Sequence, residues 1–158
     1  MILSWGKCKI EYATSSAGAP GTTWTEIDTP KEGTTKLTPT AGQEKTATAE
    51  GGETVDVKYN RNSYLFEFDL FVKKGGTAPF TDDDGIVSGE KAFRVSPVDD
   101  PSCPGIQIDR SSVRVDESYS SEDGILLHHS CKCLRPATGN TIKSYTAQTP
   151  TPGGGDSD

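Results

Sequence analysis

The chain has 158 residues, enough for one domain with a sizeable hydrophobic core. Its 23 acidic residues outnumber its 16 basic ones, and the net charge of −7 argues against a protein that grips nucleic acid through its phosphates. The low hydrophobic content of 32%, with 17 glycines and 10 prolines, favours many short strands joined by turns. No apolar run is long enough for a secretory signal or a membrane span, so we expect a soluble protein made in the cytoplasm.

Alternating and threonine-rich segments predict a mainly β protein, an antiparallel sandwich or barrel of about nine or ten strands with at most one short helix. The expected strands, in chain order, are residues 4–12, 24–28, 35–38, 44–50, 53–59, 64–73, 92–96, 105–109, 112–118 and 125–135. Long loops are expected at 13–23 and 74–91. We assign residues 1–145 to this single domain and residues 146–158, which are rich in Thr, Pro, Gly and Asp, to a disordered tail.

Residues 53–73 alternate apolar and polar side chains most strictly, and this predicts an antiparallel hairpin with its turn at residues 60–62. One face of the first strand carries Val55, Val57 and Tyr59. The apolar face of the second strand is expected to meet the core, and it comprises Tyr64, Phe66, Phe68, Leu70 and Val72.

The opposite face of that second strand mixes apolar and acidic side chains. It carries Leu65, Glu67, Asp69 and Phe71, together with Lys73. Such a face is too apolar for plain solvent and too charged for a core, which is typical of a surface that meets another subunit. Leu65, Glu67, Asp69 and Phe71 are therefore the predicted subunit interface.

The cysteines are few and irregularly spaced, so we expect them to be reduced. His129, Cys131 and Cys133 share one face of the last long strand, and with Cys8 as a fourth ligand they would make a zinc-like set. Against zinc, the usual C-x-x-C spacing is absent, and small buried hydrophobic residues explain the two neighbouring cysteines. A disulfide from Cys8 to either of them is a further alternative.

Other chemistry-bearing patterns are incomplete. The acidic run Thr81–Glu90 suggests calcium, but two main ligand positions of the EF-hand template fall on Phe80 and Lys91, so a solvated turn is the better interpretation. The only two histidines, His128 and His129, are adjacent on opposite faces of one strand, and no nucleophile elbow or phosphate loop is present. We therefore expect neither an enzyme nor a bound cofactor or metal.

Between residues 30 and 136 the chain resembles the tail tube (major tail) proteins of bacteriophages and prophages, whose fold is related to the ring protein of type VI secretion. The segments that carry the resemblance are Gly51–Tyr59, Ser63–Gly75, Asp84–Gly89, Phe93–Pro97 and Tyr119–Gly124. The resemblance implies a tube-fold sandwich or barrel with no catalytic residues. It also implies a hexameric ring, stacked into a hollow tube through which DNA passes without specific binding.

The resemblance further implies contacts with other tail proteins, none with a membrane, and a place in the virion tail after synthesis in the bacterial host. The acidic net charge suits such a lumen, since basic residues would hold phosphates. Two other classes stay open. One is an extracellular or cell-surface sandwich for adhesion, and the other is a small metal-dependent enzyme built on His129, Cys131 and Cys133.

Overall fold

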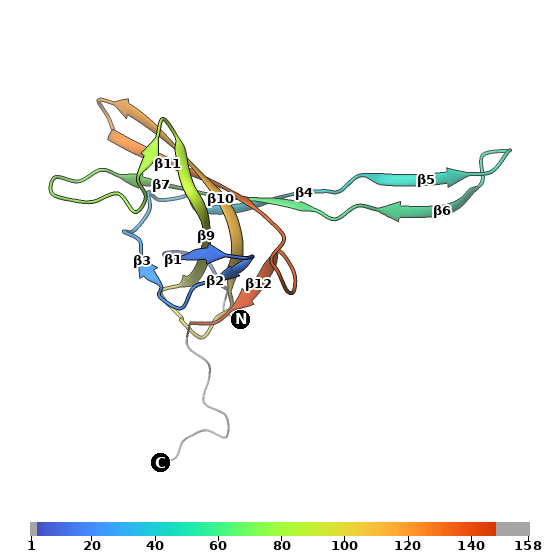
Figure 1. Cartoon of the computed structure of the whole chain (residues 1–158), viewed down its shortest axis with the longest axis horizontal. Coiled ribbons are helices and arrows are strands. Elements are labelled where there is room, and N and C mark those ends of the chain that lie inside the picture. The colour runs from blue at the N-terminus through green and yellow to red at the C-terminus, as the bar shows by residue number, and fades with distance from the viewer. Residues whose placement is uncertain (1–2, 148–158) are drawn as a thin grey trace, which may run out of the picture.

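The computed structural model describes residues 3–147, and every regular element among them is a strand (Figure 1). The elements are β1 (Cys8–Ser16), β2 (Ala19–Pro20), β3 (Thr25–Glu26), β4 (Lys36–Thr40), β5 (Glu44–Thr48), β6 (Thr54–Tyr59), β7 (Ser63–Phe71), β8 (Asp82–Asp83), β9 (Ile86–Pro97), β10 (Gly105–Ser120), β11 (Gly124–Cys133) and β12 (Ile142–Tyr145). No helix in the described part of the chain could span a membrane. The predicted mainly β, antiparallel class is confirmed.

Ten strands form one curled antiparallel sheet with the order β2-β1-β9-β10-β11-β7-β4, and β3, β8 and β12 pair along its sides. Residues 27–34 close the curl. The amide of Ile27 donates to the carbonyl of Ile10 on β1 at 2.8 Å, and the amide of Lys31 donates to the carbonyl of Asp69 on β7 at 2.8 Å. Because β1 and β7 lie toward opposite ends of the strand order, this segment ties the sheet into one closed body.

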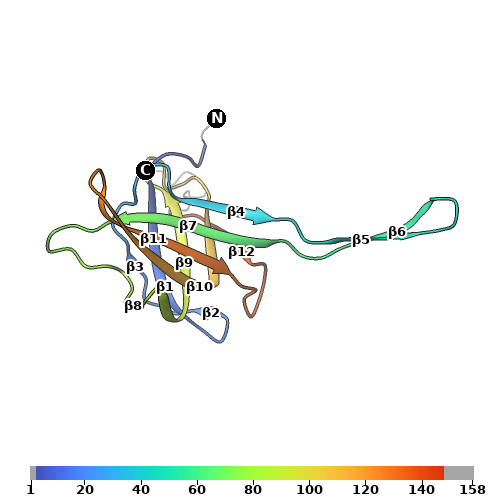
Figure 2. The same cartoon turned by 90° about the horizontal axis from the view of Figure 1, so that it is seen from above.

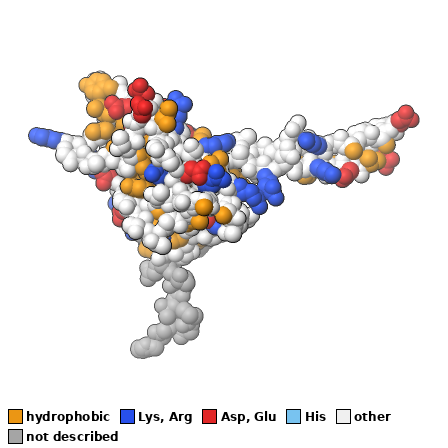
Figure 3. Space-filling view, viewed as in Figure 1, with side chains coloured by type: hydrophobic (Ala, Val, Ile, Leu, Met, Phe, Trp, Pro, Cys, Tyr) orange, Lys and Arg blue, Asp and Glu red, His pale blue; other side chains and the backbone are white. Residues whose placement is uncertain are grey.

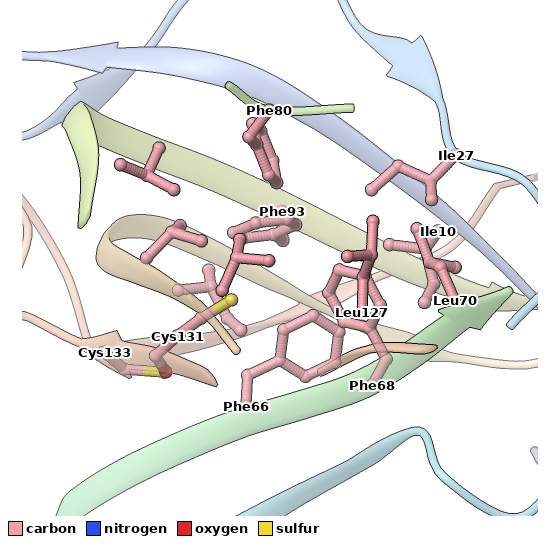
Figure 4. Close-up of a cluster of buried hydrophobic side chains, with 14 residues drawn as sticks. Ile10, Ile27, Phe66, Phe68, Leu70, Phe80, Phe93, Leu127, Cys131 and Cys133 are labelled. Atoms are coloured by element: carbon pink, nitrogen blue, oxygen red, sulfur yellow. The ribbon is translucent and has the colours of Figure 1, made fainter. Parts of the chain in front are cut away.

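The core lies inside the curl and is centred on aromatic side chains from β7 and β9. Phe66 and Phe68 of β7 point toward Phe93 of β9, with ring centroids 5.5 and 6.0 Å apart (Figure 4). All three rings are buried, and burial of a phenylalanine side chain contributes about 1.5–3 kcal/mol. The predicted core face of residues 64–72 is thus confirmed for Phe66, Phe68 and Leu70, whereas Val72 is exposed.

The predicted hairpin of residues 53–73 is wrong. β6 pairs with β5, and β7 pairs with β4 and β11, so the chain continues through residues 60–62 without reversing. The reversal occurs instead at Gly51 and Gly52, whose φ values of 90° and 91° suit glycine. Alternation reports which side chains share a face, but it does not identify the partner strand.

Residues 41–62 therefore form a long projection, called the arm here, which carries the separate two-stranded sheet of β5 and β6. It extends from the ends of β4 and β7, away from the body (Figures 1 and 2). From the rise per residue of a strand, the arm is about 30 Å long.

Three further expectations need correction. The loop predicted at 13–23 is partly strand, because β1 runs to Ser16 and turns at Ala17 and Gly18, with φ of 54° and 78°, into β2. The loop predicted at 74–91 contains β8 and the start of β9. The strands predicted at 105–109 and 112–118 are one strand, β10, with register shifts against β9. In the predicted tail, residues 148–158 lie outside the described residues.

Candidate assembly surfaces

The arm has one apolar face and one charged face. In the β5–β6 register Thr46 lies opposite Val57 and Glu44 opposite Tyr59, so these side chains share a face with Val55. Val55, Val57 and Tyr59 are 63%, 36% and 72% exposed. The other face has Lys45 directly opposite Lys58, a like-charge pair that does not favour the hairpin.

Nothing in the described body covers the arm. All residues of β5 and β6 are exposed, and neither strand pairs with the large sheet. An isolated two-stranded hairpin is at best marginally stable in water. A second surface laid against its apolar face would supply the missing burial, so the arm has the character of a docking element.

The predicted interface on β7 is on the outer side of the sheet, as expected, but its acids already have partners within the chain. His128 of β11 lies between them, with Nδ1 2.5 Å from Oδ1 of Asp69 and Nε2 3.1 Å from Oε2 of Glu67. Glu67 also has Lys36 of β4 at 3.8 Å. Leu65 is half-buried and Phe71 is 39% exposed, so the role of these four residues at an interface stays a prediction.

The electrostatics of His128 follow from this position. Burial lowers the pKa of its imidazole, but the hydrogen bonds to and the charges of Asp69 and Glu67 together outweigh burial and raise it above the ordinary value. When protonated, the ring donates to both carboxylates, which joins β11 to β7 across the outer face of the sheet.

The next residue, His129, points the opposite way, into the core. It stacks on Phe68 with ring centroids 4.5 Å apart and an interplanar angle of 9°, and its Nδ1 lies 3.1 Å from the carbonyl of Leu127. Burial is the largest cause of its altered pKa, which is lowered to about 4. The neutral imidazole therefore acts as a flat core side chain.

The candidate zinc ligands are not assembled into a site. His129, Cys131 and Cys133 are buried on one face of β11, as predicted, but no group of three or more His, Cys, Asp or Glu within residues 3–147 is placed to hold a metal. Burial raises the pKa of the Cys133 thiol to about 11 and that of Cys131 well above its usual value. All four cysteines, Cys8 included, are free in the structure, and their reduced state stays a prediction.

The acidic run of residues 81–90 is the hairpin of β8 and β9, with its turn at Asp84 and Gly85. Asp84 and Gly85, with φ of 47° and 95°, form the two-residue connection between β8 and β9, and a carboxylate oxygen of Asp82 accepts from the amide of Gly85 at 2.9 Å. This local bond explains the aspartates as turn residues.

The search of family models and of curated proteins found no match for this chain. Sequence reasoning placed Val55, Val57 and Tyr59 on one face but missed that this face belongs to an arm. The available signal was the Gly51-Gly52 pair between two polar, alternating strands, which is a turn in its own right.

Proposed function

We propose that this chain is a structural subunit that assembles with copies of itself into hexameric rings, which stack as the hollow tail tube of a phage or prophage. Its place would be the virion tail, among other tail proteins, and DNA would pass through the lumen without being held. The role is structural rather than catalytic. The observation that carries the proposal is the arm, an amphipathic hairpin that finds no cover on its own body.

Two further features support self-assembly. Exposed apolar side chains also lie at the edge where β7 and β10 end and β11 begins, namely Val72, Tyr119 and Ile125, and exposed apolar surface is typical of interfaces. The net charge of −7 suits a conduit for DNA, because an acidic wall repels phosphates.

The test is the oligomeric state at rising protein concentration, followed by light scattering and negative-stain microscopy. Wild-type protein is expected to form rings or tubes with a central hole. The amide of Asn60 donates to the carbonyl of Gln43 at 2.9 Å, so residues 44–59 can be replaced by an Asn-Gly turn without disturbing the body. This armless variant is expected to fold and to remain monomeric.

A matched pair of variants separates the role of the apolar face from the mere presence of the arm. Val55→Thr with Val57→Thr keeps shape and strand propensity but removes apolar contact, whereas Lys45→Thr with Lys58→Thr changes the other face by the same residue type. We expect only the first variant to lose assembly. A wild-type protein that stays monomeric at high concentration would refute the proposed function and favour the adhesion alternative.

A further inference from the structure

A groove of about 740 Å³ lies on the body between residues 4–8, residues 29–37 and residues 104–106. Its apolar lining includes Trp5, Leu37, Phe66, Val95 and Ile106. The indole of Trp5 is 75% exposed, an unusual state for so large an apolar side chain. We call this feature the lysine-rimmed groove, because three lysines line it, Lys7, Lys31 and Lys36, against one acid, Glu32.

The outer part of the arm has the complementary character. Residues 46–57 contain Glu50, Glu53 and Asp56 and no basic residue, whereas the lysines and the arginine of the arm are nearer its base. Acidic side chains mark the arm's far end in Figure 3. Val55 and Val57 provide apolar contact within the same stretch. Acidic charge would thus meet a basic rim, and apolar side chains an apolar lining.

We propose that the arm of one copy docks with its apolar face in the lysine-rimmed groove of a second copy. This contact rests on the proposed self-assembly and specifies its partner and its two surfaces. The arm points away from its own body, so its tip is not directed at its own groove (Figures 1 and 2). In the proposed ring this contact runs head-to-tail, so each copy both offers an arm to one neighbour and accepts an arm from the other.

Charge selects this groove over the other exposed apolar surfaces. A second hollow, of about 410 Å³, is lined by Tyr12, Leu70 and Leu127 but has Glu26 and Asp28 against Lys73. The apolar patch at Tyr119 and Ile125 adjoins acids as well, Glu117 and Glu122. Both would repel the acidic end of the arm. In the groove, Lys31 and Lys36 already pair with Asp123 and Glu67, at 3.0 and 3.8 Å, whereas Lys7 is exposed, so the charge contact with the arm depends on Lys7.

The chain contains a reporter for this contact. Cys8 lines the groove and is partly exposed, whereas Cys103, Cys131 and Cys133 are buried. In the full chain, Val55→Cys should form an interchain disulfide with Cys8 under mild oxidation with copper phenanthroline. Head-to-tail contact gives a ladder of covalent oligomers on non-reducing gels, and peptide mapping should find the 8–55 link.

Two controls make the result specific. Val55→Cys combined with Cys8→Ser is expected to give no ladder, since arm-to-arm linkage stops at dimers. Lys58→Cys, on the opposite face of the arm, is expected to give no more than a tenth of the ladder. If the wild type assembles but Val55→Cys gives no ladder, docking of the arm in the groove is refuted while the proposed self-assembly stands. A wild-type protein that never assembles would overturn both.

A charge exchange gives an independent readout in assembly itself. Lys7→Glu is expected to raise the concentration needed for assembly about tenfold, and Glu53→Lys to do likewise. The two together should restore that concentration to within about threefold of wild type. If the double variant is as weak as the product of the single effects, the arm does not dock beside Lys7.

Discussion

The adjacent histidines should make stability depend on pH in opposite directions. The pKa of His129 is lowered to about 4 by burial, below the value of about 6.5 in the unfolded chain. Between these values the unfolded state binds the proton and the folded state does not, so stability falls as pH falls. For His128 the folded pKa is raised, so its contribution is fully present below about pH 6.5 and is lost as pH rises through the folded pKa.

The magnitude for His129 follows from the two pKa values. From pH 7 to pH 5 its contribution to the free energy of unfolding falls by about 2 kcal/mol. The opposite contribution of His128 masks part of this in the wild type. His128→Gln removes this opposing contribution. His129→Leu removes the protonation of the buried imidazole while keeping an apolar side chain against Phe68.

Urea unfolding at pH 5 and pH 7, read by tryptophan fluorescence on unassembled protein, measures both effects. Between pH 7 and pH 5 the His128→Gln variant should lose about 2 kcal/mol more than the double variant His128→Gln/His129→Leu, because all other titrating groups are common to the two. Equal pH dependence in these two proteins would refute the reasoning, since it would mean that His129 is protonated as easily in the folded as in the unfolded state.

Three other variants test the interface and the fold. Leu65→Ser with Phe71→Ser should leave the body folded but weaken self-association in light scattering; collapse of the monomer would show that these residues are core. Arg94→Lys should lower the free energy of unfolding, measured in urea, by about 1–2 kcal/mol. The guanidinium of Arg94 donates to both carboxylate oxygens of Glu11, at 2.9 and 3.3 Å, and its Cζ lies 4.3 Å from the ring centroid of Trp24, and lysine can form neither the bidentate contact nor the stacking. Gly105→Ala would place a Cβ 1.9 Å from a carbonyl oxygen of β9, so a loss of about 3 kcal/mol in thermal unfolding is expected, and an unchanged Tm would contradict that clash.

The sequence predicted which side chains share a face of a strand better than it predicted which strands pair. Alternation identified the buried side of β7 and the shared face of His129, Cys131 and Cys133, because strand side chains point alternately to opposite sides whatever the neighbouring strand is. It did not reveal β9 before residue 92, since Ser88-Gly89-Glu90-Lys91 is polar and becomes strand only through pairing with β1 and β10. Long-range pairing decides such segments, and local preference does not.

The candidate sites divide in the same way. The mixed face of β7 was evident, but the partner of its acids was not, because the contact of His128 with Asp69 depends on the register between β7 and β11, across 59 residues of sequence. The groove brings together residues from the N-terminal segment, from residues 29–37 and from β9 and β10, so no local pattern could have predicted it.

The arm explains why the strictest alternation misled. In β7 the apolar side of the pattern faces a core, and Phe66 and Phe68 are buried. In β6 the alternation is equally regular, yet the chain places no core beneath Val55 and Val57. A strand patterned for burial that its own body does not provide points to a surface on another molecule. The wrong hairpin prediction and the proposed docking thus have one physical origin. Alternation shows that one face of a strand is suited to burial, but it does not show whether the same chain or another chain covers that face.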